Sequence, residues 1–219
     1  METSDRVAAG QAVYTPITLK IYDWLVLGIS NRFLWRCPTA ELEAMYDRNV
    51  SDNHLDIGVG TGYFLDKAKW PVANPRITLV DLNPHSLVAA SNRIVRYSPS
   101  TVAANVFEPL PVQLKFDSVS MSYLLHCLPG KMSEKAPVVF DHVLNVMAPG
   151  AKVFGATILQ GDRPRSRPAQ IVMNFYNRKG VFSNQNDTAP ELECALREKF
   201  NEVKIAHRGV VAVFEARNA

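Results

Sequence analysis

The stretch "LDIGVGTG" (residues 55–62) decides the fold class of this chain. It places three glycines at alternate positions after an aspartate that ends a short apolar run. Glycine adopts left-handed backbone conformations without strain and lets a ligand approach the chain closely. A glycine-rich loop after a strand is typical of nucleotide binding at the edge of a parallel sheet. The remaining question is which nucleotide this loop suits.

Short runs rich in Val, Ile, Leu and Thr alternate with helical segments around this loop. We expect strands over residues 54–58, 76–81, 101–106, 116–122 and 151–159. Asn83 and Pro84 form an N-cap and first-turn proline, which predicts a helix to about Tyr97. Apolar residues at helical spacing predict a second helix from about Lys131 to Met147.

The C-terminal part no longer alternates single strands with helices. After a helix from about Ala189 to Phe200, only Gly209 and its neighbours separate the runs 202–209 and 210–218. Two runs this close together are expected to pair as an antiparallel hairpin. The whole chain is therefore predicted to be an α/β protein with a doubly wound, mostly parallel seven-stranded sheet and a C-terminal antiparallel hairpin.

The spacing of the loop argues against two common phosphate-binding motifs. A dinucleotide fingerprint needs G-x-G-x-x-G, but Gly58, Gly60 and Gly62 lie two apart and Tyr63 takes the third glycine position. The Gly-Lys-Ser/Thr end of a P-loop is missing, and Asp56 would repel a pyrophosphate. Asp81, nineteen residues beyond Gly62, stands where a carboxylate accepts hydrogen bonds from ribose hydroxyls. These features favour S-adenosylmethionine, an adenosine with a cationic amino-acid arm.

At this point the sequence resembles the class I S-adenosylmethionine-dependent methyltransferases. "LDIGVGTG" matches their first motif, D-x-G-x-G-x-G, and "LVDLNPHSL" (79–87), "AANVFEPLP" (103–111), "FDSVSMSYLLHCLP" (116–129) and "VLNVMAPGAKVFGATIL" (143–159) resemble later ones in order. The family often has Asp where this chain has Asn105, which can also accept a hydrogen bond from the adenine amine. The resemblance implies S-adenosylmethionine as cofactor, S-adenosylhomocysteine as product, and as cofactor-binding residues Asp56, Gly58, Gly60, Gly62, Asp81, Leu82, Asn105, Val106 and Ser122.

Simpler roles for these residues remain open. Gly60 and Gly62 could serve only a tight turn between a strand and a helix. Asp81 could be a helix-start residue, although Asn83 already supplies the cap. Asn105 could be a turn former.

Methyl transfer from a sulfonium is an in-line displacement, so the protein mainly aligns acceptor, methyl and sulfur. A general base helps only where the acceptor must lose a proton. His126, just after the fourth strand, is the candidate base, and a structural role is its alternative. Ser122 and Tyr123 at the same strand end are expected to line the path of the methyl group.

We expect a single domain, 1–219, in four parts: an N-terminal helical lid (1–50), a cofactor-binding core (51–160), an acceptor lid insertion (161–188), and a C-terminal helix and hairpin (189–219). The first part opens a helix at Thr15-Pro16, and a helix covering the sheet flank is its alternative. Aromatic side chains that can stack on a sulfonium or hold an acceptor make up the candidate substrate-binding set: Tyr14, Tyr22, Trp35, Tyr123, Phe175 and Tyr176.

The segment from Gly161 to Gly180 carries a local net charge of +4 in a chain of net +3. Its apolar residues Ile171, Val172, Phe175 and Tyr176 fall on one helical face, and Gly180 suits the C-terminal cap. Three interpretations are open: a solvated basic face, a site for an acidic group on an apolar acceptor, and a docking surface for nucleic acid. No motif of a nucleic-acid-binding module accompanies the arginines.

Composition limits the class of protein and its expected location in the cell. The chain has no stretch of about 18 uninterrupted apolar residues, so we expect no membrane span. Three widely spaced cysteines without a CxxC pair predict reduced thiols, a cytoplasmic protein and no metal site. The sequence thus predicts a methyltransferase that transfers a methyl group by in-line displacement to a small molecule, expected to be a secondary metabolite. An RNA or protein methyltransferase that uses the Arg-rich segment 161–180 and a non-catalytic cofactor-binding protein are the alternatives. It does not determine the oligomeric state.

Overall fold

The computed structural model describes residues 30–161 and 164–218 and contains one seven-stranded sheet. The strand order is β3-β2-β1-β4-β5-β7-β6, with β1 to β5 parallel and β7 antiparallel to both of its neighbours. The bounds are β1 Asn53–Ile57, β2 Arg76–Asp81, β3 Ser100–Ala103, β4 Phe116–Ser122, β5 Met147–Ile158, β6 Glu202–Arg208 and β7 Val211–Arg217. This architecture confirms the predicted doubly wound sheet and its C-terminal hairpin.

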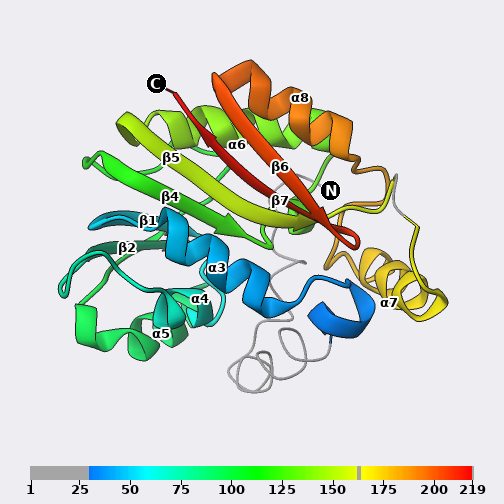
Figure 1. The fold of residues 1–219 in the computed structure, drawn as a ribbon, viewed down its shortest axis with the longest axis horizontal. Helices are drawn as coiled ribbons and strands as arrows, with labels where there is room; N and C mark the ends of the chain where they lie inside the picture. The colour runs from blue at the N-terminus through cyan, green and yellow to red at the C-terminus, as the bar shows by residue number, and fades with distance from the viewer. Residues whose placement is uncertain (1–29, 162–163, 219) are drawn as a thin grey trace.

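Helices cover both faces of the sheet (Figure 1). One face carries α3 (Thr39–Asn49), α4 (Tyr63–Lys67) and α5 (Pro84–Arg93), and the other carries α6 (Met132–Leu144) and α8 (Ala189–Lys199). An apolar core fills each interface, one around Phe140 and Phe214 and the other around Tyr46 and Phe154. Both faces are therefore closed, as a mostly parallel sheet requires.

The predicted helix starts hold, whereas some strand ends differ. The Asn83 side chain accepts the His85 N–H at 2.9 Å and begins α5 as expected. The strand expected over 101–106 ends at Ala103, because the Asn105 side chain accepts the Phe107 N–H and turns the chain. The strand expected over 151–159 begins earlier, at Met147. Helix α5 also ends early, and a separate 3₁₀ turn covers Val95–Tyr97.

The described parts of the N-terminal segment and of the insertion 161–188 lie at different places in the fold. For residues 30–50, the structure has the flank-covering arrangement, since α3 packs on α4 and β5. Thr15-Pro16 and the aromatic residues before residue 30 lie outside the described residues. Helix α7 (Arg167–Arg178) lies past the carboxyl ends of β4 and β5 (Figure 1).

The apolar face predicted for helix α7 is only partly covered in the structure. Ala169 and Met173 are buried, whereas Ile171 is 67% exposed and Phe175 is 45% exposed. The predicted helix is present, and of its four apolar residues Ile171 and Phe175 are exposed whereas Val172 and Tyr176 are half-buried. The cap is as expected, with Gly180 at φ +70° after the last turn. No helix in the described part of the chain is long and apolar enough to cross a membrane.

Candidate functional site

A pocket of about 130 Å³ lies at the carboxyl ends of β1, β2 and β4. Its walls come from the ends of these strands, the glycine loop, the first turn of α4 and the segment after β3. The pocket brings together all nine residues predicted to bind the cofactor: Asp56, Gly58, Gly60, Gly62, Asp81, Leu82, Asn105, Val106 and Ser122. Their separation in sequence is bridged by parallel strands that end at one edge of the sheet.

Two glycines of the loop are needed for different reasons. Both adopt left-handed backbone, with φ of +53° at Gly60 and +71° at Gly62. A Cβ on Gly62 would lie 2.9 Å from the Cα of Ala90, so this glycine allows α4 to begin against α5. A Cβ on Gly60 meets no atom within 4 Å, because this residue faces the open pocket.

Alanine at these two positions is expected to separate folding from binding. Gly62→Ala combines a left-handed alanine with a clash against backbone, which should lower the free energy of unfolding by about 3 kcal/mol. Gly60→Ala carries only the backbone strain, about 1–2 kcal/mol, but places a methyl group in the pocket. Urea unfolding and calorimetric titration with S-adenosylmethionine measure the two effects. Equal loss of stability in both variants would contradict the packing role of Gly62.

Asp81 is held by the backbone around it. Its Oδ1 accepts the Asn83 N–H at 2.8 Å, and the amides of Gly60 and Val59 also donate to the carboxylate. Burial raises the pKa of Asp81 to about 6, and these backbone hydrogen bonds oppose the rise. The carboxylate is therefore ionised at neutral pH and lies in the pocket wall as an acceptor.

Asp56 lies deeper, at the end of β1, and is 4% exposed. Its Oδ1 accepts hydrogen bonds from the Tyr46 hydroxyl at 3.3 Å and from the Ser120 hydroxyl. Burial raises the pKa of Asp56 to about 7, with a smaller rise from the charge of Asp81. A cation entering the pocket would favour the ionised form of both carboxylates.

Two polar side chains of the pocket, Asn105 and Ser122, differ in their hydrogen bonding. The Oδ1 of Asn105 accepts the Phe107 N–H at 3.1 Å, so Asn105 forms a turn and lines the pocket at once. The Ser122 Oγ is buried and lies near the Tyr46 hydroxyl, but it makes no hydrogen bond of good geometry with the described residues. It is therefore able to form a hydrogen bond with a bound ligand.

His126 is the one predicted site residue of this strand end that does not line the pocket. It is 2% exposed, and its Nδ1 accepts the Ile158 N–H at 3.3 Å. Its ring meets the Phe182 ring edge-on, with centroids 4.5 Å apart. Burial, and then the charge of Lys135, lowers its pKa to about 3. These contacts favour the structural role over that of a base.

The candidate substrate-binding residues separate into four groups. Tyr123 lines the pocket with φ +61°, and its hydroxyl donates to Asn31 Oδ1 at 2.7 Å. Trp35 is 2% exposed and packs against Phe182, so the structure places it in the core and not at the pocket. Phe175 and Tyr176 lie on α7, and neither lines the pocket. Tyr14 and Tyr22 lie outside the described residues.

Sequence reasoning missed several residues that line the pocket. Tyr63 and Phe64 follow the glycine loop directly, and their position next to the motif could have identified them. Tyr46, which stacks on Phe64 with centroids 5.1 Å apart, comes from a helix before the motif and carried no spacing signal. The other missed lining residues include Thr61, Ser86, Leu124, Cys127 and Leu128.

The donor set of the pocket suits a cationic nucleoside. Two carboxylates, two side-chain amides and several hydroxyls surround an open glycine backbone, while no arginine or lysine lines the pocket among the described residues. Within the same residues, no three His, Cys, Asp or Glu side chains come together as a candidate metal site. The arrangement therefore fits S-adenosylmethionine.

Comparison with known proteins agrees with this site. A family model described as a methyltransferase domain matches residues 55–153. The chain is 45% identical over 212 residues to demethylluteothin O-methyltransferase of Streptomyces thioluteus. The matched region covers 96% of this chain and 92% of that protein. The chain is 41% identical over 210 residues to the physcion biosynthesis cluster O-methyltransferase of Aspergillus chevalieri, across 94% of each chain.

A solved structure shows the same fold at low sequence identity. It is the N-methyltransferase NodS from Bradyrhizobium japonicum WM9 in complex with S-adenosyl-L-homocysteine. The TM-score is 0.58 at 19% identity, over 82% of this chain and 87% of NodS.

Proposed function

The chain belongs to the class I S-adenosylmethionine-dependent methyltransferases, and on that premise we propose that it methylates an oxygen atom of a small-molecule acceptor, a secondary metabolite. The observation that carries this proposal is the pocket, in which the residues of the family motifs converge on a space lined by carboxylates. The choice of oxygen rests on the two relatives, both O-methyltransferases that match nearly the whole chain.

We assign the cofactor to the pocket residues as follows. Asp81 accepts hydrogen bonds from the ribose hydroxyls, Leu82 and Val106 pack on the adenine, and Asn105 meets its polar edge. Asp56 faces the cationic arm, and Ser122 offers its hydroxyl at the same end. When bound, S-adenosylmethionine supplies an electrophilic methyl group on a sulfonium.

The protein's contribution to the reaction is proposed to be alignment. No histidine or lysine lines the pocket among the described residues, and the Tyr123 hydroxyl is hydrogen-bonded to Asn31. Holding two reactants in line can supply roughly 7–11 kcal/mol of barrier reduction. We therefore propose an acceptor hydroxyl that is acidic enough to ionise without a histidine base, and a structural role for His126.

The segment 161–188 is proposed to close the acceptor side as a lid. Its helix α7 lies past the carboxyl ends of the strands, and the Tyr176 ring packs on Phe182, 4.9 Å away, which in turn contacts His126. The apolar side chains Val172 and Tyr176 are half-buried on the inner side of the helix. An acceptor with a largely apolar body suits this side.

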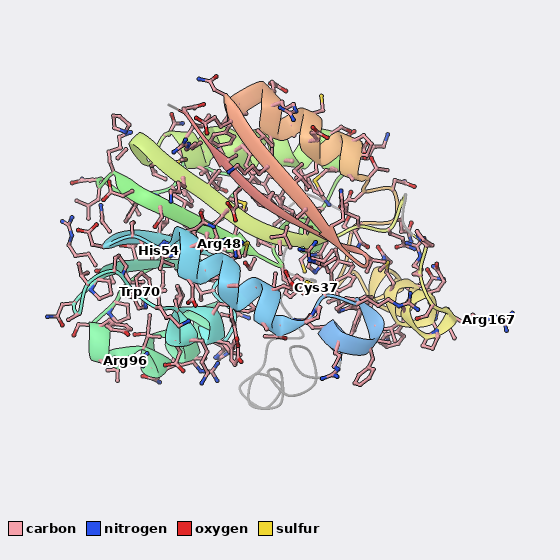
Figure 2. All side chains as sticks on the ribbon, viewed as in Figure 1. Cys37, Arg48, His54, Trp70, Arg96 and Arg167 are labelled. Atoms are coloured by element: carbon pink, nitrogen blue, oxygen red, sulfur yellow. The ribbon has the colours of Figure 1, made fainter. Side chains whose placement is uncertain are left out.

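The charges of α7 favour a solvated face over a single anion site. Arg167 at its start and Arg178 and Lys179 at its end are exposed, and Arg167 points outward in Figure 2. Because a helix rises 1.5 Å per residue, the two ends lie about 16 Å apart along the axis. Such a separation does not suit one carboxylate or phosphate.

The free cysteines Cys37, Cys127 and Cys194 support a cytoplasmic location as part of the proposal.

A labelling experiment tests the class of acceptor. The protein is incubated with trideuteromethyl S-adenosylmethionine and with cell extract separated into low-molecular-weight, RNA and protein fractions. We expect the label in the low-molecular-weight fraction, on oxygen, and unchanged labelling as salt is raised. Label confined to the RNA or protein fraction, with a steep loss at higher salt, would contradict the proposal. The Asp81→Ala variant is the matched control for enzyme-independent transfer.

A further inference from the structure

A row of buried polar side chains runs along β1 and β4 to Asp56. His54 precedes Asp56 by two residues on β1, so both side chains lie on the same face of the sheet. The His54 Nδ1 lies 2.7 Å from Ser118 Oγ, and its Nε2 lies 2.9 Å from Ser120 Oγ. Ser120 in turn donates to Asp56 Oδ1. His54, Ser118 and Ser120 are all 0% exposed.

The direction of these hydrogen bonds follows from the number of protons available. Ser120 has one hydroxyl proton, which it donates to Asp56, so its oxygen accepts the proton carried by His54 Nε2. Burial lowers the pKa of His54 to about 3, so the ring is neutral and its Nδ1 is an acceptor for Ser118. Ser118 also accepts the Ser51 N–H at 3.0 Å. Each donor in the row therefore points toward Asp56.

Packing alone does not require this row. His54 lies between the rings of Trp70 and Phe154, with centroids 5.4 Å and 5.8 Å away, and Figure 2 shows it beside Trp70. An apolar side chain would suit such surroundings without burying polar groups. Hydrogen bonds in series polarise one another, so a donor from His54 makes Ser120 a stronger donor to the carboxylate.

The row orients the Asp56 carboxylate more strongly than the other charged and titratable groups around it do. Tyr46 of α3 donates to the same oxygen at a longer distance, 3.3 Å. The charge of Asp81 on β2 raises the pKa of Asp56, and Ser120 of β4 donates a hydrogen bond to it.

We propose that His54 is a positioning residue for cofactor binding, which acts through Ser120 to hold Asp56 as an oriented, ionised acceptor for the cationic arm of S-adenosylmethionine. This inference rests on the proposed function, because it takes Asp56 to be the partner of that cation.

The row has a consequence for the pH dependence of binding. The pKa of Asp56 without ligand is raised to about 7, so the carboxyl group is neutral below that pH and charged above it. A cation needs the charged form, so affinity rises as pH increases through about 7, and binding below this pH releases a proton. Removal of the row takes a donor away from the charged form and moves this midpoint upward.

Calorimetric titration with S-adenosylmethionine from pH 6 to 9, in two buffers of different ionisation enthalpy, measures both affinity and proton release. Asparagine keeps an amide near Nδ1 but none near Nε2, whereas glutamine places an N–H near Nε2. We expect His54→Asn to raise the midpoint by about one pH unit, with roughly tenfold weaker binding at pH 6.5, and His54→Gln to keep the midpoint of the natural protein.

Thermal unfolding of each variant separates positioning from stability. An unchanged midpoint and unchanged proton release in His54→Asn, whatever its melting temperature, would overturn the inference. Should His54→Asn fail to fold, Ser118→Ala replaces it: loss of the partner that fixes the ring tautomer is expected to raise the midpoint by a smaller amount, and no change overturns the inference. Failure of the unmodified protein to bind at any pH would refute the proposed function itself.

Discussion

Replacement of Asp81 by alanine is expected to weaken S-adenosylmethionine binding by about 100-fold or more. The carboxylate is oriented by four backbone amides and lines the pocket, where it accepts the two ribose hydroxyls in the proposed complex. A hydrogen bond to a charged group contributes about 1.5–3 kcal/mol, and each 1.4 kcal/mol changes affinity about tenfold. Isothermal calorimetry with the purified variant measures the loss.

The control is an aspartate on another strand of the same sheet. Asp117 of β4 is exposed and does not line the pocket, so Asp117→Ala is expected to bind as the natural protein does. Micromolar affinity retained in Asp81→Ala would remove Asp81 from the ribose site and leave it as a turn residue that accepts the Asn83 N–H.

The second large effect concerns stability. Lys135→Met is expected to lower the free energy of unfolding by about 3–5 kcal/mol, because it leaves Asp187 as an uncompensated buried charge. The Lys135 Nζ lies 2.7 Å from Asp187 Oδ2 and donates to the carbonyls of Ser183 and Leu128, and both charged side chains are at most 1% exposed. The pair ties α6 to the segment after α7. Urea unfolding followed by circular dichroism gives the change.

A double variant tests the physical reason for this loss. Lys135→Met combined with Asp187→Leu removes both charges and is expected to recover most of the stability. The exposed pair Arg197–Glu193 of α8 is the matched control, and Arg197→Met should change stability by no more than about 1 kcal/mol. A Lys135 variant no less stable than the Arg197 variant would contradict the view that the buried pair holds these segments together.

Much of the fold could be predicted because its signals are local. The Asn83-Pro84 cap, the alternation of strands and helices, and the short link at Gly209 each act within a few residues of the element they define. Boundaries that failed depend on side-chain contacts: β3 ends early because the Asn105 side chain turns the chain. Helical spacing groups Ile171, Val172, Phe175 and Tyr176 on one face of α7, but it does not say which of them a neighbour covers.

In the candidate site, too, the features set by local sequence could be predicted and those set by distant contacts could not. The motif residues of the pocket follow one another at strand ends, so the sequence brings them to one edge of the sheet. His126 also follows a strand end, but the Ile158 amide and the Phe182 ring, both distant in sequence, hold it in the interior. Trp35 is likewise buried by Phe182. The row through His54 depends on side chains of β4 more than sixty residues away, and nothing in the sequence around His54 indicates it.

The most direct test of the account is a crystal structure of the protein with S-adenosylhomocysteine. The account predicts that the nucleoside lies in the pocket of the "LDIGVGTG" loop, with its ribose hydroxyls on Asp81 and its amino-acid arm on the side of Asp56 and Ser122. A nucleoside bound outside this pocket, or one in it whose ribose makes no contact with Asp81, would contradict it.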